Sequence, residues 1–373
     1  MPSPTKQAVI QRHAQNELLT TPAPSLMMRD AQDLSADEAL APLDERIIAS
    51  TVEALEAGQT HYAPVPGIDP LREAVAAHLN HTLGTGYQAA NVLVTAGMQE
   101  ARFLTTQMVG QQFGRIALPT VVHPGVRKAL GVRPMPIDAI DVDTQGRMLP
   151  TPAAIRRVLE GGSRLLYLES PSRLTGAAYG AGDVAAITAL VSEFEATVIW
   201  DQGLAAWVPP GDYISLATQE DSSTRVIAIG EAWPGMGLAS WFVGYIAAPE
   251  DRIPPMQSQK QIMAICTSTP SQFAALEASR LFATAHPGHM QQLSRARASL
   301  LEQAASASLQ PIDGAAVNVL ALRPPPQDAE AVQTTLRQAG YTVAEGKDFG
   351  APHILRLTVS TSQAATAALR QLA

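Results

Sequence analysis

TVIWD at residues 197–201 and RVIAIGE at residues 225–231 are the stretches of sequence that decide the fold. Each is a short apolar run that closes on an acidic side chain, Asp201 in the first and Glu231 in the second. Continuous apolar runs of this length are typical of strands that are buried on both faces of a sheet. Ligands of parallel sheets lie beyond the carboxyl ends of the strands, so Asp201 and Glu231 are candidate site residues.

Similar runs and helical segments extend this pattern in both directions along the chain. Buried strands that alternate with helices predict an α/β domain whose mainly parallel sheet is covered on both faces. The predicted strands are 91–96, 115–119, 164–169, 197–200, 225–229 and 241–247, and the predicted helices are 70–83, 98–109, 152–159 and 182–195.

The two ends of the chain read differently from this central part. Residues 36–58 predict a helix, and residues 270–307 predict a long helix that is interrupted near His286-Pro287-Gly288. The tail predicts a small α+β domain, with strands at 318–322, 341–345 and 354–359 and helices at 329–338 and 363–372. We therefore predict a large domain over residues 60–270 and a small domain built from residues 1–59 and 271–373.

Composition excludes several classes of partner. The chain has 373 residues and a net charge of −8, so it has no basic surplus to neutralise nucleic acid or an anionic membrane. No run approaches the roughly 18 apolar residues of a membrane span, and residues 1–18 lack the apolar core of a signal peptide, so we expect a cytoplasmic protein. His78 and His81 lack a third ligand nearby, and we expect no metal site.

Four motifs occur in a fixed order along the chain. YAPVPGIDPLR at residues 62–72 is followed by TAGMQEA at 95–101, by Asp201, and by HILRL at 353–357. Over roughly residues 60–360 this order resembles the class I and II aminotransferases, which are pyridoxal-phosphate (PLP) enzymes of fold type I. The resemblance implies a seven-stranded, mainly parallel sheet in the large domain.

The resemblance also implies a role for each motif. Tyr62 would reach the cofactor phosphate of a neighbouring subunit, which implies a homodimer. Gly97 and Met98 would meet the phosphate where a helix begins, because free N–H groups converge there. Asp201 would pair with the pyridine nitrogen of the cofactor. Arg356 would bind the carboxylate of an amino or keto acid with its planar guanidinium.

The sequence departs from the family at the residues that hold the cofactor. The position of the lysine that bonds the cofactor is occupied by Glu231, and no lysine lies between Lys128 and Lys260. We expect Lys260 to face solvent, because its neighbours are polar. The family asparagine that touches the cofactor's phenolic oxygen is replaced by Arg173. Other family residues that contact the cofactor are replaced by Leu204 and Ala228, and the arginine that clamps the phosphate has no counterpart near Ala239 or Ser240.

These departures leave three interpretations open. In the first, an enzyme binds PLP or pyridoxamine phosphate (PMP) without a covalent bond, and Glu231 or His123 transfers the proton. In the second, the chain is an inactive pseudo-aminotransferase that serves as a binding or regulatory subunit. In the third, the pocket holds a different ligand. In all three we expect Arg173 and Glu231 to form an ion pair, because a buried glutamate needs a partner.

Overall fold

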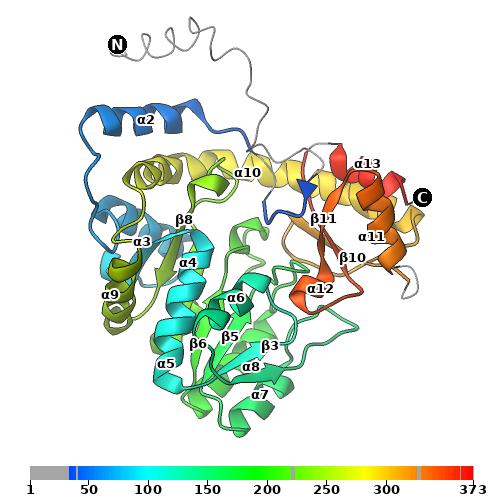
Figure 1. The fold of residues 1–373 in the computed structure, drawn as a ribbon, viewed down its shortest axis with the longest axis horizontal. Helices are drawn as coiled ribbons and strands as arrows, with labels where there is room; N and C mark the ends of the chain where they lie inside the picture. The colour runs from blue at the N-terminus through cyan, green and yellow to red at the C-terminus, as the bar shows by residue number, and fades with distance from the viewer. Residues whose placement is uncertain (1–32, 39–40, 220–222, 326–328, 362, 373) are drawn as a thin grey trace, which may run out of the picture.

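Two sheets organise the molecule. The computed structural model describes residues 33–38, 41–219, 223–325, 329–361 and 363–372. A seven-stranded sheet and a five-stranded sheet lie side by side in Figure 1. Within the described residues, no helix is both long and apolar enough to cross a membrane.

The seven-stranded sheet confirms the predicted α/β architecture. Its strand order is β2-β8-β7-β6-β5-β3-β4, and only β8 runs antiparallel to its neighbours. All six predicted strands are present, and β4 was missed because it is an edge strand whose side chains are mostly exposed. The bounds are β2 Val92–Ala96, β3 Ile116–Pro119, β4 Ile137–Ile140, β5 Leu165–Glu169, β6 Thr197–Asp201, β7 Val226–Glu231 and β8 Val243–Ala247.

Helices cover both faces of this sheet, as the continuous apolar runs require. Alternate side chains of β6 enter opposite cores: Ile199 packs in one core with Met98, and Val198 packs in the other with Leu190. The first core lies under α4 Gly97–Leu104, α6 Pro124–Val132 and α9 Ile253–Met263, and the second under α3 Asp69–Leu83, α7 Pro152–Glu160 and α8 Ala181–Glu193. The helix predicted at 98–109 is present. It consists of α4, a π-helical stretch Thr105–Val109, and α5 Gly110–Phe113, which follow one another without a break.

The two long helical predictions need correction. The helix predicted at 36–58 begins only at Glu45, because Asp44 caps α2 Glu45–Glu56 by accepting a hydrogen bond from the Arg46 N–H. Residues 39–40, within that prediction, lie outside the described part of the chain. The expected break near Pro287 is absent, and α10 is continuous over Thr269–Ser306. The ring of His286, directly before the proline, is buried against Phe282 and Trp207, and this packing holds the helix together there.

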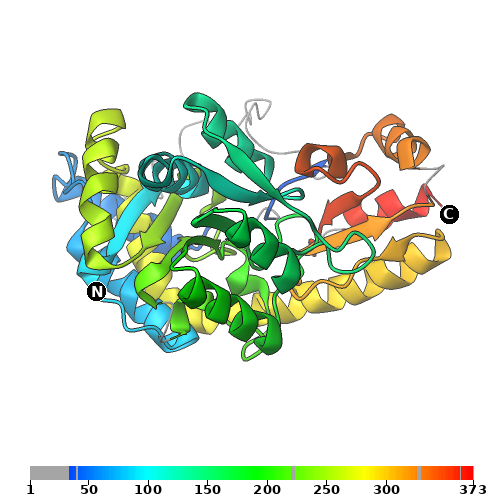
Figure 2. The same cartoon turned by 90° about the horizontal axis from the view of Figure 1, so that it is seen from below.

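The five-stranded sheet confirms the α+β character of the tail. Its order is β1-β11-β12-β10-β9, with β1 parallel to β11 and the remaining pairs antiparallel. Figure 2 shows α10 running from the large sheet to this small one. The strands of the small sheet and the helices of the tail are β1 Asp33–Leu34, β9 Gln310–Pro311, β10 Val319–Arg323, α11 Ala329–Gln338, β11 Thr342–Glu345, α12 Gly346–Phe349, β12 Leu355–Thr358 and α13 Ala364–Arg370. The division at residue 270 stays a prediction, and residues 1–32 lie outside the described chain.

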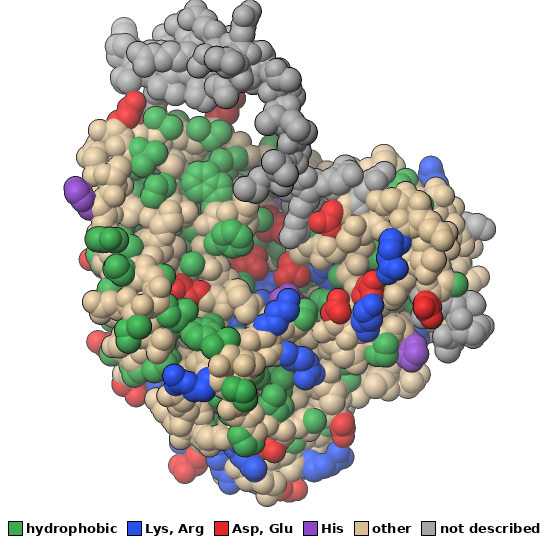
Figure 3. All heavy atoms as spheres, viewed as in Figure 1, with side chains coloured by type: hydrophobic (Ala, Val, Ile, Leu, Met, Phe, Trp, Pro, Cys, Tyr) green, Lys and Arg blue, Asp and Glu red, His purple; other side chains and the backbone are tan. Residues whose placement is uncertain are grey.

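Charged side chains gather in the hollow between the two sheets. In Figure 3 acidic and basic groups meet there, below the grey atoms, whereas the flanking surface is a mixture of types. The carboxyl ends of β5, β6 and β7 belong to the same region, because Glu169 lies beside Asp201 in register and Asp201 beside Ile229. The sheet therefore presents its strand ends to this hollow, as expected for a ligand site.

Candidate functional site

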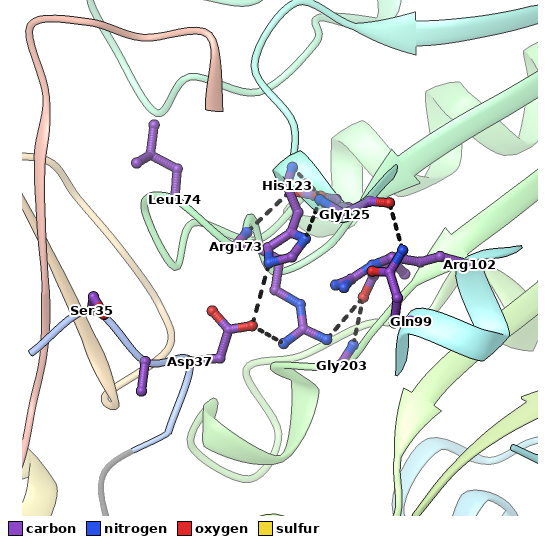
Figure 4. A network of polar contacts seen from close by, with 12 residues as sticks. Ser35, Asp37, Gln99, Arg102, His123, Gly125, Arg173, Leu174 and Gly203 are labelled. Atoms are coloured by element: carbon purple, nitrogen blue, oxygen red, sulfur yellow. Dashed lines mark hydrogen bonds and ion pairs between the residues drawn. The ribbon is translucent and has the colours of Figure 1, made fainter. Parts of the chain in front are cut away.

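Arg173 is the centre of the candidate site. It lies in the loop after β5, and its side chain is completely buried. Its Nη1 lies 3.1 Å from the Glu231 carboxylate and 3.3 Å from that of Asp37, and its Nη2 lies 3.4 Å from Asp201 (Figure 4). The expected ion pair between Arg173 and Glu231 is confirmed. Burial would lower the pKa of Arg173, but the surrounding carboxylates raise it well above its usual value, so this cation is permanent.

Both carboxylate oxygens of Asp201 accept hydrogen bonds from other groups of the chain. Oδ2 accepts a hydrogen bond from Arg102 Nη2 at 3.1 Å and one from the Tyr167 hydroxyl at 2.7 Å. Oδ1 accepts from the Gly203 N–H at 3.0 Å. Burial would raise the pKa of Asp201, but Arg173 and Arg102 outweigh burial and lower it. Sequence reasoning missed Arg102, although it lies one helical turn after Met98 and so on the same side of α4.

Arg356 lies in the site but already holds partners. Its side chain is completely buried on β12. Nη1 donates to the backbone oxygens of Ser35 at 3.1 Å and Ala36 at 2.8 Å, and Nη2 lies 3.0 Å from Asp37 Oδ1. The carboxylate bound by Arg356 is therefore that of Asp37, a residue of the same chain. Sequence reasoning missed Asp37 because it assigned residues 36–58 to one helix.

Asp37 joins the two arginines. Its carboxylate contacts Arg356 through Oδ1 and Arg173 through Oδ2, and Oδ2 also lies 3.7 Å from His123 Nε2. Burial would raise the pKa of Asp37, but Arg356 and Arg173 together hold it well below its usual range. The Asp37 side chain keeps 29% of its surface exposed, whereas both arginines are covered completely. Asp37 is thus the outer, anionic layer over two buried cations.

His123 borders the same cluster as the N-cap of α6. Its Nδ1 accepts a hydrogen bond from the Gly125 N–H at 3.0 Å, and its ring meets Phe349 edge to face at 5.7 Å between centroids. Burial, reinforced by Arg102, lowers the pKa of His123 to about 3, so the ring is neutral at pH 7. With Nδ1 acting as an acceptor, the ring proton lies on Nε2, which faces Asp37. Its expected role in proton transfer stays a prediction.

Two glutamates beside the site have raised pKa values. Burial raises the pKa of Glu231, and Arg173 only partly offsets this effect. Burial and the neighbouring Glu231 raise the pKa of Glu38 to about 8. The Glu38 carboxyl also accepts a hydrogen bond from the Gly235 N–H at 2.8 Å. At neutral pH Glu38 therefore keeps a proton that an ordinary glutamate would have released.

The remaining predicted residues lie outside this cluster. Gly97 begins α4 with φ +72°, and Met98 packs in the core beneath the sheet. The Ala96 N–H at this helix start is taken by the Glu100 carboxylate, which also pairs with Lys260 at 2.7 Å. Lys260 is completely buried, so the expectation that it faces solvent is wrong. The exposed Tyr62 takes no part in the cluster, and its role in a second subunit stays a prediction.

A cavity of about 360 Å³ adjoins the start of α4. No lysine or arginine lines it. Several hydroxyl groups and two aromatic rings form its wall, which consists of Ala96, Ser240, Trp241, Phe242, Thr267, Ser268 and Ser271.

The residues present do not fit a PLP ring held in the way that the resemblance implies. The Asp201 oxygens that would face a pyridine nitrogen are bonded to Arg102, Tyr167 and Gly203. A Cβ added to Gly203 would lie 2.6 Å from Arg173 Cζ, so the guanidinium fills the space beside that backbone. Residue 231, where the resemblance places the bonding lysine, is a glutamate. Among the described residues no cluster of histidine, cysteine and carboxylate groups could hold a metal ion.

Comparison with known proteins identifies the family of this chain. The family described as aminotransferase class I and II matches residues 30–372. Aspartate/prephenate aminotransferase of Thermus thermophilus is 27% identical over 348 residues, which are 90% of this chain and 88% of that protein. Aspartate aminotransferase of Bacillus subtilis is 22% identical over 355 residues, which are 89% of this chain and 88% of that protein.

Solved structures show the same fold. A mutant aspartate aminotransferase of Thermus thermophilus has a TM-score of 0.82 at 23% identity, with 92% of this chain and 96% of that chain covered. The aromatic aminotransferase of Pyrococcus horikoshii has a TM-score of 0.84 at 20% identity, with 92% and 95% covered. The predicted fold type I architecture is confirmed, and the chain belongs to the family of class I and II aminotransferases.

Proposed function

We propose that this chain binds a small amino or keto acid through Arg356 and Arg173 and is not a lysine-dependent transaminase. The observation that carries the proposal is that these two buried arginines jointly hold one carboxylate, that of Asp37. A site that fixes one carboxylate between two guanidinium groups suits the carboxylate of a small ligand equally well. Because no lysine stands at position 231, covalent attachment of PLP there is excluded.

The class of ligand follows from the relatives. The matched proteins are named for aspartate and prephenate, both of which carry carboxylates. In this chain the two arginines would bind and orient such a ligand. Glu38, whose pKa is raised to about 8, would donate a hydrogen bond to its polar groups, and Glu231 would accept one. The chain would then serve as a binding protein on an aminotransferase scaffold.

A second candidate function is a non-covalent complex with PLP or PMP. It is favoured by one observation, the presence of Asp201 at the carboxyl end of β6, where the resemblance places the partner of the pyridine nitrogen. Such a complex requires the Arg173 side chain to leave the backbone of Gly203, and Arg102 to release Asp201. If bound, the cofactor would supply an electron sink, and Asp201 would hold the proton on its ring nitrogen.

Calorimetric titration with 2-oxoglutarate, L-aspartate and L-glutamate tests the proposal. Saturable binding that is lost in Arg356→Gln, and kept in Arg157→Gln, supports carboxylate recognition at Arg356. Arg157 is a matched control, because it pairs with Asp141 on the exposed surface. Absorbance titration with PLP and PMP, followed by borohydride reduction, tests the second candidate. No binding of any of the three acids at millimolar concentration would overturn the proposed function.

We further propose that the chain forms a homodimer through an apolar rim, defined as Tyr62, Phe242, Ile262, Met263 and Ile265. These side chains are exposed, at 81% for Ile262 and 80% for Tyr62. Their chain segments meet, because Thr269 Oγ1 donates to the His61 oxygen and Phe242 shares a cavity with Thr267. Sedimentation equilibrium should report a dimer that Phe242→Asp and Ile262→Asp dissociate, whereas Val132→Asp, also exposed, should not. A monomeric wild-type protein would contradict this assembly.

A further inference from the structure

A short segment crosses from the small sheet to the candidate site. We call residues 33–38 the strap. Its first two residues form β1, which pairs with β11 through Asp33 opposite Thr342 and Leu34 opposite Val343. The Leu34 side chain is buried in the core of the small sheet. The strap is therefore anchored at its start by backbone pairing and by apolar burial.

The middle of the strap is held by β12 and by Asn318, the residue directly before β10. Thr358 Oγ1 donates to the backbone oxygens of Leu34 and Ala36. Asn318 Nδ2 donates to the Asp37 backbone oxygen at 2.8 Å. Together with the two bonds from Arg356 to Ser35 and Ala36, these contacts aim the Asp37 side chain at the buried arginines.

The far end of the strap reaches the large sheet. Asp37 contacts Arg173 on the loop after β5, and Glu38 accepts from the Gly235 N–H beyond β7. Figure 4 shows Asp37 entering between His123 and Arg173 from the strap side. The strap thus bridges the two sheets over the site. Its contacts with the loops of the large sheet are made by the carboxyl groups of Asp37 and Glu38.

Asp37 is an incomplete ligand for the arginines that it holds. It offers a single oxygen to each guanidinium, at 3.0 Å for Arg356 and 3.3 Å for Arg173. The Nε–H donors of both arginines are buried without a hydrogen-bond partner. A free carboxylate, which no strap backbone constrains, can present both oxygens to one guanidinium and satisfy these donors.

The geometry points to the strap as an internal competitor of the ligand: a carboxylate from solution displaces Asp37 from Arg356 and Arg173 and releases residues 35–38. The identity of the physiological ligand rests on the proposed function. The exchange of one carboxylate for another does not depend on it. The β1 pairing remains, because Leu34 stays buried. Only the molecules in which the strap is already displaced can bind the ligand. The apparent affinity is therefore the affinity of the free arginines multiplied by the fraction of such molecules.

Acetate can replace the missing side chain in Asp37→Ala, and this tests the exchange without any physiological ligand. Sodium acetate should raise the melting temperature of Asp37→Ala saturably, relative to sodium chloride at equal ionic strength. The shift should be smaller for wild type, in which Asp37 competes with acetate, and equally small for Asp141→Ala, a control in an exposed surface ion pair. If acetate shifts Asp37→Ala no more than it shifts the control, the carboxylate position is not exchangeable and the inference fails.

Asp37→Asn keeps the shape of the strap and covers the case in which Asp37→Ala does not fold. Calorimetry with 2-oxoglutarate should give binding to Asp37→Asn at least about tenfold tighter than to wild type, because minor open states are typically populated at a tenth or less. Hydrogen exchange of the strap should become faster when wild type binds 2-oxoglutarate. Equal affinities, or a strap whose exchange slows, would overturn the inference.

The two proposals fail in different ways. If acetate rescues Asp37→Ala but no amino or keto acid binds any variant, the strap stands as an internal ligand and the proposed function fails. If 2-oxoglutarate binds wild type and Asp37→Asn equally and the binding depends on Arg356, the proposed function stands and the strap inference fails.

Discussion

The guanidinium of Arg173 lies directly against the backbone of Gly203, where any side chain would overlap it. Gly203 follows Asp201 by two residues, so this contact occupies the wall on which the resemblance places the cofactor ring. An arginine in the loop after β5 and a glycine after β6 thus complement each other. This fit explains how the bulky guanidinium is accommodated beside the end of β6.

The first prediction concerns this contact. Gly203→Ala should lower the free energy of unfolding by about 1–3 kcal/mol, because the added methyl group overlaps a buried guanidinium that has nowhere to move. Urea denaturation measures this loss. Gly182→Ala is the matched control: nothing lies within 4 Å of its added Cβ, and it sits in α8, so it should be neutral or stabilising by about 0.5–1 kcal/mol.

A double-mutant cycle separates the overlap from other effects of the methyl group. In an Arg173→Asn background the guanidinium is gone, so Gly203→Ala should then cost little. Additive losses in the double variant would mean that Gly203 is needed for its backbone rather than for the space that it leaves to Arg173.

The second prediction is that the ring position can be reopened. The double variant Arg173→Asn/Glu231→Lys removes the filling cation and supplies an amine where the resemblance places it. It should show a saturable absorbance change with PLP and a borohydride-trappable bond at position 231, located by peptide mass spectrometry. Wild type should show neither, because Arg173 fills the space and residue 231 is a carboxylate.

Two single variants serve as controls for this reconstruction. Glu231→Lys alone should trap little PLP, because Arg173 still occupies the space and repels the new amine. Arg173→Asn alone should bind PLP without a trappable bond at residue 231. A trappable bond at residue 231 in Glu231→Lys alone would show that Arg173 does not block the ring position.

The sheet could be predicted from the sequence because buried strands leave a strong signal. The six predicted runs are all strands, and the only strand of the large sheet that was missed is β4, whose residues are mostly exposed. Asp201 and Glu231 were placed correctly at strand ends for the same reason. The pairing of Arg173 with Glu231 followed from the cost of burying a lone carboxylate.

Asp37 could not be predicted as a site residue. It lies far from the strand ends in sequence, and its role depends on long-range pairing of β1 with β11 that no local pattern encodes. Lys260 was misjudged from its polar neighbours. Its helical spacing did hold a signal, because Ile253, Met256 and Lys260 recur at i, i+3 and i+7 and all three are buried on α9.

The third prediction is a pH dependence that originates in Glu38. The pKa of Glu38 is raised to about 8 in the folded protein from 4.5, so the folded state holds a proton that the unfolded state releases. Its contribution to stability is therefore complete below pH 4.5 and declines as the pH rises to 8. Relative to Glu38→Gln, wild type should lose about 3–4 kcal/mol of unfolding free energy between pH 5 and pH 8.

Thermal or urea unfolding of both proteins across this pH range measures the difference. Glu56→Gln, which alters an exposed glutamate of α2, should follow wild type at every pH. A constant difference between wild type and Glu38→Gln would contradict the raised pKa of Glu38.

The fourth prediction concerns the buried pair of Lys260 and Glu100. Lys260 Nζ lies 2.7 Å from Glu100 Oε2 and donates to Thr267 Oγ1 at 3.0 Å. Lys260→Met leaves a buried carboxylate without its cation, and it should destabilise the protein by about 3–5 kcal/mol. Glu100→Gln keeps an acceptor for the Ala96 N–H but removes the charge, so the double variant should recover much of that loss. Urea denaturation of the two single variants and the double variant measures the coupling, and strictly additive losses would show that the pair is not a closed ionic unit. Because the pair is closed, borohydride reduction with PLP should label the exposed Lys347 and leave Lys260, the only buried lysine among the described residues, unmodified. Lys260 therefore should not take the role that the resemblance assigns to a lysine at position 231.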